Sequence, residues 1–187
     1  MMDQSTREKI LENAVMIFSR KGFHGTSMRD IAGACGCSLP TLYYHCKSKS
    51  ELFEEIVVNQ FMQVTDRMNR KLDLGAKPEE LYFQVLRTRK ELEGFDREVF
   101  KMALKVWLGF DGEGKAREQV MAWEKRRADA NRRFIDKAGL KEALRGDVTE
   151  ILINYMESAI NRIILLDEDI DDDKLRRQIG LLFKLGK

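Results

Sequence analysis

The sequence is poor in proline, which ends helices, in cysteine, which forms disulfides, and in histidine, which binds metals. Its 187 residues include two prolines, three cysteines and two histidines. No apolar run approaches the roughly 18 residues that a membrane span requires. The opening residues, MMDQSTREKI, contain no hydrophobic signal core. With few cysteines and no secretory signal, the sequence predicts a cytoplasmic protein that does not contact a membrane.

The scarcity of histidine and cysteine also leaves little for catalysis or metal binding. His24 and His45 are the two histidines, and neither an HExxH nor a GxSxG motif occurs. The cysteines at 35, 37 and 46 match no common zinc spacing. We interpret them as small core residues, with metal or thiol sensing as the alternative. We therefore expect no catalytic residue, no metal and no cofactor.

Residues 26–49 contain a strong local pattern: two short helices joined by a tight turn. Ser27 begins the first helix with a capping box, and Gly36 ends it. Ser38 caps the second helix, where Pro40 sits in the first turn without losing a hydrogen bond. This order is the helix-turn-helix signature, whose second helix enters the DNA major groove.

The second helix of this pair carries polar groups suited to DNA. Hydroxyl and imidazole groups can reach phosphates or base edges, and lysines follow directly. Residues 1–50 hold seven Lys/Arg against four acids, so the positive excess of the chain lies here. The predicted DNA-contacting residues are Thr26, Ser27, Ser38, Leu39, Pro40, Thr41, Tyr43, Tyr44, His45 and Lys49.

From residue 7 to about residue 57 the sequence resembles the TetR family of bacterial transcriptional regulators. The resemblance rests on five elements in register: the first helix ILENAVMIFSRKGF, then GTSMRDIA, the CGCS turn, TLYYH and KSKSELF. It implies a three-helix DNA-binding domain followed by a larger helical domain for dimerisation and, usually, a small inducer. Leu39 and Pro40 depart from the family pattern, which favours small residues there, and Cys46 stands in place of an aromatic residue.

Hydrophobic periodicity predicts an all-α protein of about nine helices, with no strand and no internal repeat. We expect a DNA-binding domain at 1–50 and a regulatory and dimerisation domain at 51–187. Ser48 and Glu51 predict a capping box for a long fourth helix that ends near Gly75, and Asp147 and Glu150 predict another at the start of the penultimate helix. The later helices are expected at 78–94, 96–108, 115–138, 147–166 and 173–185.

The helix expected at 147–166 is apolar on two sides, and the last helix is strongly apolar on one. One stripe suffices for packing within a domain, so the second predicts a two-fold dimer interface, with full burial within one chain as the alternative. The predicted interface residues are Ile153, Met156, Ile160, Ile164, Ile179, Leu182 and Phe183.

Aromatic and methionine residues are frequent in the middle of the chain, where they could form a core or line an apolar pocket. The candidate ligand-binding residues are Tyr82, Phe83, Phe100, Met102, Trp107, Phe110, Trp123, Asn154 and Tyr155. Because Glu157 is the one acid beside this set, we expect a neutral or singly cationic inducer.

Taken together, these patterns predict a dimeric repressor that a small apolar or aromatic inducer releases from a double-stranded DNA operator. The alternative is an architectural DNA-binding protein of the same fold without a ligand.

Overall fold

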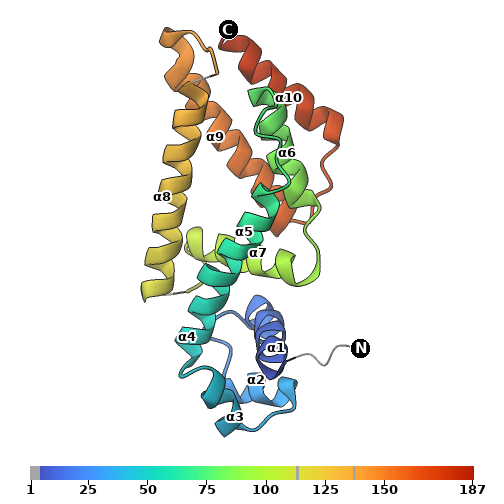
Figure 1. Ribbon diagram of the computed structural model, residues 1–187, viewed down its shortest axis with the longest axis vertical. Coiled ribbons are helices and arrows are strands. Elements are labelled where there is room, and N and C mark those ends of the chain that lie inside the picture. Colours follow the sequence, from blue (N-terminus) through green and yellow to red (C-terminus); the bar gives the residue numbers. More distant parts are fainter. Residues whose placement is uncertain (1–4, 113, 137) are drawn as a thin grey trace. The chain divides into compact units, whose positions relative to one another are not determined.

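The computed structural model describes residues 5–112, 114–136 and 138–187, and within these ranges every regular element is helical (Figure 1). Over the described residues, none of the helices is long and apolar enough to cross a membrane. The all-α prediction is confirmed. The helices are α1 (Thr6–Lys21), α2 (Met28–Cys35), α3 (Leu39–His45), α4 (Lys49–Glu54), the π-helical segment η1 (Glu55–Gln60), α5 (Phe61–Asn69), α6 (Pro78–Lys90), α7 (Gly94–Trp107), α8 (Gly114–Asp136), α9 (Glu142–Leu165) and α10 (Asp172–Leu185).

Since α4, η1 and α5 follow one another without a break, the described residues form nine continuous helices, as the periodicity predicted. They divide into two compact units. The first unit comprises residues 5–65 and 93–122, and the second comprises residues 66–92 and 123–187.

The first unit is built around α1, which packs against α2, α4 and α7. Phe18 on α1 and Phe53 on α4 are almost fully buried, and their rings meet edge to face with centroids 5.1 Å apart. Phe23, in the loop after α1, lies 5.0 Å from the ring of Phe53. This aromatic cluster fixes α4 against the start of the chain, since such pairs add to the free energy of plain burial.

The second unit joins α6, α9 and α10, each of which packs against the other two. Leu86 from α6, Ile164 from α9 and Ile179 from α10 are completely buried. Phe183 lies in the same core, with its ring centroid 5.8 Å from that of Tyr82. The three helices therefore share one apolar core.

Three predicted helix boundaries are wrong. The helix expected at 78–94 ends at Lys90, and Gly94 begins α7. The fourth helix ends at Asn69 rather than near Gly75, with turns following it, and it contains a π-helical segment that the sequence did not predict. The penultimate helix begins at Glu142, so Asp147 lies inside it instead of capping it. The early start has a tertiary cause, because the Lys141 N–H donates to the Gly186 carbonyl at 2.7 Å, after α10.

Candidate nucleic-acid interface

The helix-turn-helix begins at a reciprocal capping box, as predicted. The Ser27 hydroxyl accepts from the Asp30 N–H at 3.1 Å, and the Asp30 carboxylate accepts from the Ser27 N–H at 2.9 Å. Hydrogen bonds from the Ser27 hydroxyl, the Ser27 N–H and Lys21 lower the pKa of Asp30 to about 2. Asp30 is therefore ionised at neutral pH, where its negative charge interacts favourably with the positive, N-terminal end of the α2 dipole.

The turn between α2 and α3 depends on Gly36, which has a φ of 65° in the left-handed region. The Gly36 and Cys37 N–H groups donate hydrogen bonds to carbonyls of the last turn of α2. The bond from Cys37 to the Ala32 carbonyl is 3.1 Å long. A residue with a Cβ would be strained at this φ, so the glycine sets the direction in which α3 leaves the turn.

The second helix of the pair, α3, is held by a cap and one apolar contact. The Ser38 hydroxyl accepts from the Thr41 N–H at 3.2 Å, and Pro40 sits in the first turn as predicted. Leu42 is fully buried against the rest of the unit. Because seven residues make barely two turns, burying Leu42 leaves most of the other side chains on the outside.

The outward face of α3 carries the predicted contact residues. Pro40, Thr41, Tyr43 and Tyr44 are exposed, and the Tyr44 side chain keeps 86% of its surface accessible. The Tyr44 ring contacts the His45 ring edge to face at 5.2 Å. Leu39, His45 and Lys49 are half-buried, while Ser27 and Ser38 are exposed but use their hydroxyls as caps.

Two predicted contact residues hold the loop before α2 in this structure. Thr26 is only 3% exposed, and its hydroxyl donates to the Gly22 carbonyl at 2.7 Å. The Lys49 ammonium donates to the carbonyls of Phe23 and Thr26 at 2.7 and 2.9 Å and lies 4.3 Å from the centre of the Phe23 ring. An ammonium has three donors, so Lys49 keeps one for another acceptor.

Sequence reasoning missed a residue that supports this loop from far along the chain. The Asp111 carboxylate accepts from the Phe23 N–H at 3.0 Å, although 88 residues separate them. Lys105 on α7 likewise donates to the Ser19 carbonyl at the end of α1, at 3.1 Å. No local pattern marks these contacts, because each exists only after α7 has packed on α1.

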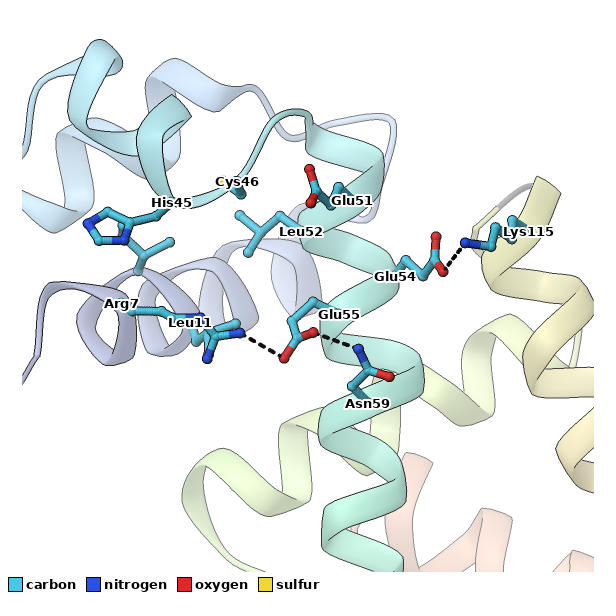
Figure 2. A pocket seen from close by; sticks show the side chains of 11 residues that line it. Arg7, Leu11, His45, Cys46, Glu51, Leu52, Glu54, Glu55, Asn59 and Lys115 are labelled. Atoms are coloured by element: carbon cyan, nitrogen blue, oxygen red, sulfur yellow. Dashed lines mark hydrogen bonds and ion pairs between the residues drawn. The ribbon is translucent and has the colours of Figure 1, made fainter.

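The continuous helix of α4, η1 and α5 carries two adjacent carboxylates, Glu54 and Glu55, that bind different neighbours (Figure 2). Glu54 pairs with Lys115 on α8 at 3.0 Å and accepts from Gln119 at 2.7 Å. Glu55 pairs with Arg7 on α1 at 3.2 Å. The hydrogen bonds from Lys115 and Gln119 lower the pKa of Glu54, and the bond from Lys115 is the main cause. The start of η1 is thereby tied to both α1 and α8.

The structure distributes the predicted ligand-binding residues over both units. Phe100 and Met102 are buried on α7 in the first unit, where Trp107 is half-buried and Phe110 is 78% exposed. In the second unit Tyr82 and Phe83 are buried, Trp123 and Tyr155 are half-buried, and Asn154 is exposed. Phe83 contributes its ring to a contact with the Arg176 guanidinium, 3.7 Å from the ring centre.

Within the second unit, charged groups come together near these residues. Arg89 is nearly fully buried and donates to the Val85 carbonyl at 3.0 Å. Burial, followed by the nearby Arg127 charge, lowers the pKa of Arg89 to about 10. Arg127 pairs with Glu124 and lies 3.5 Å from Glu157, whose own pKa is raised by burial. The sequence had marked only Glu157.

Most of the predicted dimer-interface residues lie in the core of their own chain. Met156, Ile160, Ile164, Ile179 and Phe183 are buried within the protomer, whereas Ile153 and Leu182 are half-buried. They lie on α9 and α10, which pack against each other and against α6. The helices α9 and α10 instead expose a different apolar set, which comprises Leu144, Ile151, Leu181 and Leu185.

The three cysteines are free thiols, with Cys46 buried and Cys35 and Cys37 half-buried. Across the described ranges, no group of three or more His, Cys, Asp or Glu side chains is placed to hold a metal ion.

The described residues are all-helical, and α2 and α3, which follow α1, form a capped helix-turn-helix. These features define the protein as one of the helix-turn-helix class. Within that class, residues 10–56 match the family model of the bacterial regulatory proteins, tetR family. The match covers the helix-turn-helix and the helices on either side of it.

Curated relatives share the N-terminal part. The chain is 34% identical over 76 residues to IcaR, the negative transcriptional regulator of the biofilm operon icaADBC in Staphylococcus epidermidis, with 41% of each chain covered. It is 45% identical over 56 residues to YttP of Bacillus subtilis, a probable transcriptional regulator, with 30% of this chain and 27% of YttP covered. The matches therefore span less than half of either relative's length.

Solved structures match the whole fold. Apo AibR is 25% identical with a TM-score of 0.66, covering 96% of this chain and 98% of AibR. AibR in complex with isovaleryl coenzyme A and operator DNA gives a TM-score of 0.69 at 21% identity with the same coverage. A regulator from Saccharomonospora viridis in complex with choline gives 0.73 at 20% identity, with 95% of each chain covered. At such identities the last two show the fold alone.

Proposed function

We propose that the protein is a dimeric DNA-binding repressor that a small inducer releases from its operator. The observation that carries this proposal is the geometry of α3. Its cap at Ser38 and its buried Leu42 fix the helix, so that Thr41, Tyr43 and Tyr44 point away from the protein. Residues 1–50 would bind DNA, and residues 51–187 would bind the inducer and a second subunit.

The proposed interface has a base-reading part and a phosphate-binding part. Leu39, Pro40 and Thr41 lie at the N-terminal end of α3, which is the end that meets base edges in helix-turn-helix complexes. Tyr43, Tyr44 and the lysines after α3 would bind phosphates, which fixes the position of the helix without reading sequence. A leucine side chain offers apolar contact, for which the thymine methyl group is the natural partner.

The proposed dimer would use the exposed apolar residues of α9 and α10. Ile151 and Leu144 are seven residues apart, so they share one face of α9, and Leu181 and Leu185 share one face of α10. Exposed leucines and isoleucines at such spacing are suited to an isologous interface. A second subunit would place two recognition helices on successive turns of the operator.

The proposed inducer would bind within residues 78–160 and act by population shift. Other TetR-fold proteins have been solved with isovaleryl coenzyme A or with choline, so the fold accommodates small molecules of different chemistry. A ligand lowers operator affinity only by its preference for the conformation that binds DNA less well.

The experiment that tests the DNA-reading role is a selection of duplexes from a random library with the full chain. We expect a two-fold symmetric consensus, because a symmetric dimer reads two half-sites. Leu39→Ala should change the preferred bases while affinity for non-specific DNA falls little. Leu74→Ala, at an exposed leucine outside the interface, is the matched control and should return the wild-type consensus. Identical consensus sequences from Leu39→Ala and wild type would refute this assignment of α3.

A further inference from the structure

A cavity of about 290 Å³ lies in the first unit, between α1, the end of α3 and the α4–η1 helix (Figure 2). Its inner wall is apolar and is formed by Ile10 and Leu11 of α1, Leu52 of α4 and the thiol of Cys46. All four side chains are buried, and Cys46, at 6% exposure, is the shortest of them. The inner wall is therefore apolar, and the rest of the lining is polar or charged.

The rim of the cavity is charged, and its charges do not cancel. Arg7 pairs with Glu55, and Lys115 pairs with Glu54, which neutralises four of the rim charges in two pairs. The Glu51 carboxylate accepts a hydrogen bond from the Lys47 backbone N–H at 2.7 Å. Throughout the described part of the chain, no lysine or arginine side chain pairs with Glu51, so the rim keeps one uncompensated negative charge.

Glu51 lies close to the apolar wall. Glu51 and Cys46 line the same cavity, and burial first and the Glu51 charge second raise the pKa of the Cys46 thiol. The thiol is accordingly neutral at physiological pH and acts as an apolar surface. An occupant would thus meet an apolar wall and an anionic rim within one small space.

We propose that this cavity binds a small organic cation, with a compact apolar body against Cys46 and Leu52 and an ammonium group at Glu51. The volume is at the small end of ligand pockets, which favours a molecule of one ring or a short alkyl chain. The opposite charge of the ammonium would offset the one unpaired carboxylate, whereas an anion would meet repulsion there.

The position of the cavity gives its occupant a regulatory consequence, which rests on the proposed function. The cavity is lined by His45, the last residue of α3, by Cys46, which follows it, and by Glu55 and Asn59 of the π-helical segment. An occupant would favour the conformations in which α1 and the α4–η1 helix keep their present spacing. By linkage, it would change operator affinity by its differential affinity for those conformations.

The binding test uses the full chain and three probes: benzylamine as the cation, benzyl alcohol as its neutral analogue and benzoate as the anion. Chemical-shift titration should show benzylamine binding with a Kd of about 1 mM, since so few atoms bind weakly. Benzyl alcohol should bind several-fold more weakly, and benzoate should not saturate. Equal binding of benzoate and benzylamine would overturn the proposal.

Variants locate the site. Cys46→Phe should fill the space and abolish benzylamine binding, whereas Cys46→Ala is the matched control that leaves the space open and should keep binding within about twofold. Glu51→Gln retains an acceptor for the Lys47 N–H without the charge, and should weaken benzylamine roughly three- to tenfold without affecting benzyl alcohol. If Cys46→Phe does not fold, Cys46→Met serves as the smaller filler.

Unchanged benzylamine affinity in the filled or the Glu51→Gln variant would refute the site. Because these titrations contain no DNA, they separate the two proposals. Failure of benzylamine binding alongside a specific DNA consensus would remove the cavity proposal alone, and the reverse result would remove the operator proposal alone.

Discussion

The helices of the first 54 residues begin in a different way from most of those that follow. The helices α1, α2, α3 and α4 each begin at a serine whose hydroxyl accepts a backbone N–H, namely Ser5, Ser27, Ser38 and Ser48. By contrast, α6, α7 and α9 follow Lys77, Glu93 and Lys141, none of which makes a side-chain cap. The helix-turn-helix is thus bounded by local side-chain caps, whereas α6, α7 and α9 lack them and α9 begins at a tertiary hydrogen bond.

This difference explains which boundaries could be read from the sequence. A serine cap acts within three residues, so it is visible in a single sequence. The start of α9 depends on Gly186, 45 residues away from Lys141, and no short pattern records it. Asp147 and Glu150 have the spacing of a capping box, but packing of the preceding turn against the end of α10 extends the helix past them.

The largest expected effect comes from placing a charge on α9 or α10. Ile160 is buried within its own protomer, so Ile160→Glu would put an unpaired carboxylate in the core and lower the free energy of unfolding by about 3–5 kcal/mol. Leu181 is half exposed, so Leu181→Glu should leave the fold intact and produce monomers. Chemical denaturation and sedimentation velocity would distinguish these outcomes. A folded but monomeric Ile160→Glu variant would instead support the dimer interface predicted from the sequence.

A smaller effect is expected at Lys49. Lys49→Met removes two hydrogen bonds and the contact with the Phe23 ring, so the free energy of unfolding should fall by about 1–2 kcal/mol. Since its third donor is proposed to bind a phosphate, the salt slope of non-specific DNA binding should also fall by about one. Lys47→Met, at an exposed lysine nearby, is the control for stability, which it should not change. An unchanged salt slope in Lys49→Met would show that Lys49 serves the loop alone.

The caps themselves provide a third test. Ser27→Ala should cost about 1 kcal/mol, because α2 loses the acceptor for the Asp30 N–H. Lys141→Ala should cost almost nothing at the start of α9, since its side chain makes no cap and the backbone bond to Gly186 remains. Thermal or urea unfolding of both variants measures the comparison. Equal losses at the two positions would contradict a division between local and tertiary helix starts.

The smallest effect is a pH dependence within the helix-turn-helix. The folded pKa of Asp30, about 2, lies below the unfolded value of about 3.9. Its contribution to stability is therefore complete above about pH 4 and is lost as the pH falls toward 2. Asp30→Asn should flatten this part of the unfolding profile, by less than the loss caused by Ser27→Ala. A profile unchanged by the substitution would show that the carboxylate adds nothing.

Sequence reasoning recovered the fold class, the helix-turn-helix and its caps because each rests on a local signal. It did not recover the contacts that Asp111 and Lys105 make with Phe23 and Ser19, since these contacts join segments more than 80 residues apart. It also placed Ile160 and Phe183 in a dimer interface, whereas both are buried in the protomer. An apolar stripe shows that a helix face is covered, but the stripe alone cannot show whether the same chain or a partner covers it.

The most direct test of the central claim is a comparison of affinities at one salt concentration. Fluorescence anisotropy would measure the Kd of the full chain for the selected duplex and for a scrambled duplex of the same length and composition. If α3 reads bases, the ratio of the two Kd values should be about 10³ or greater near physiological salt. A ratio close to one would contradict the account, because phosphate contacts alone do not distinguish sequences.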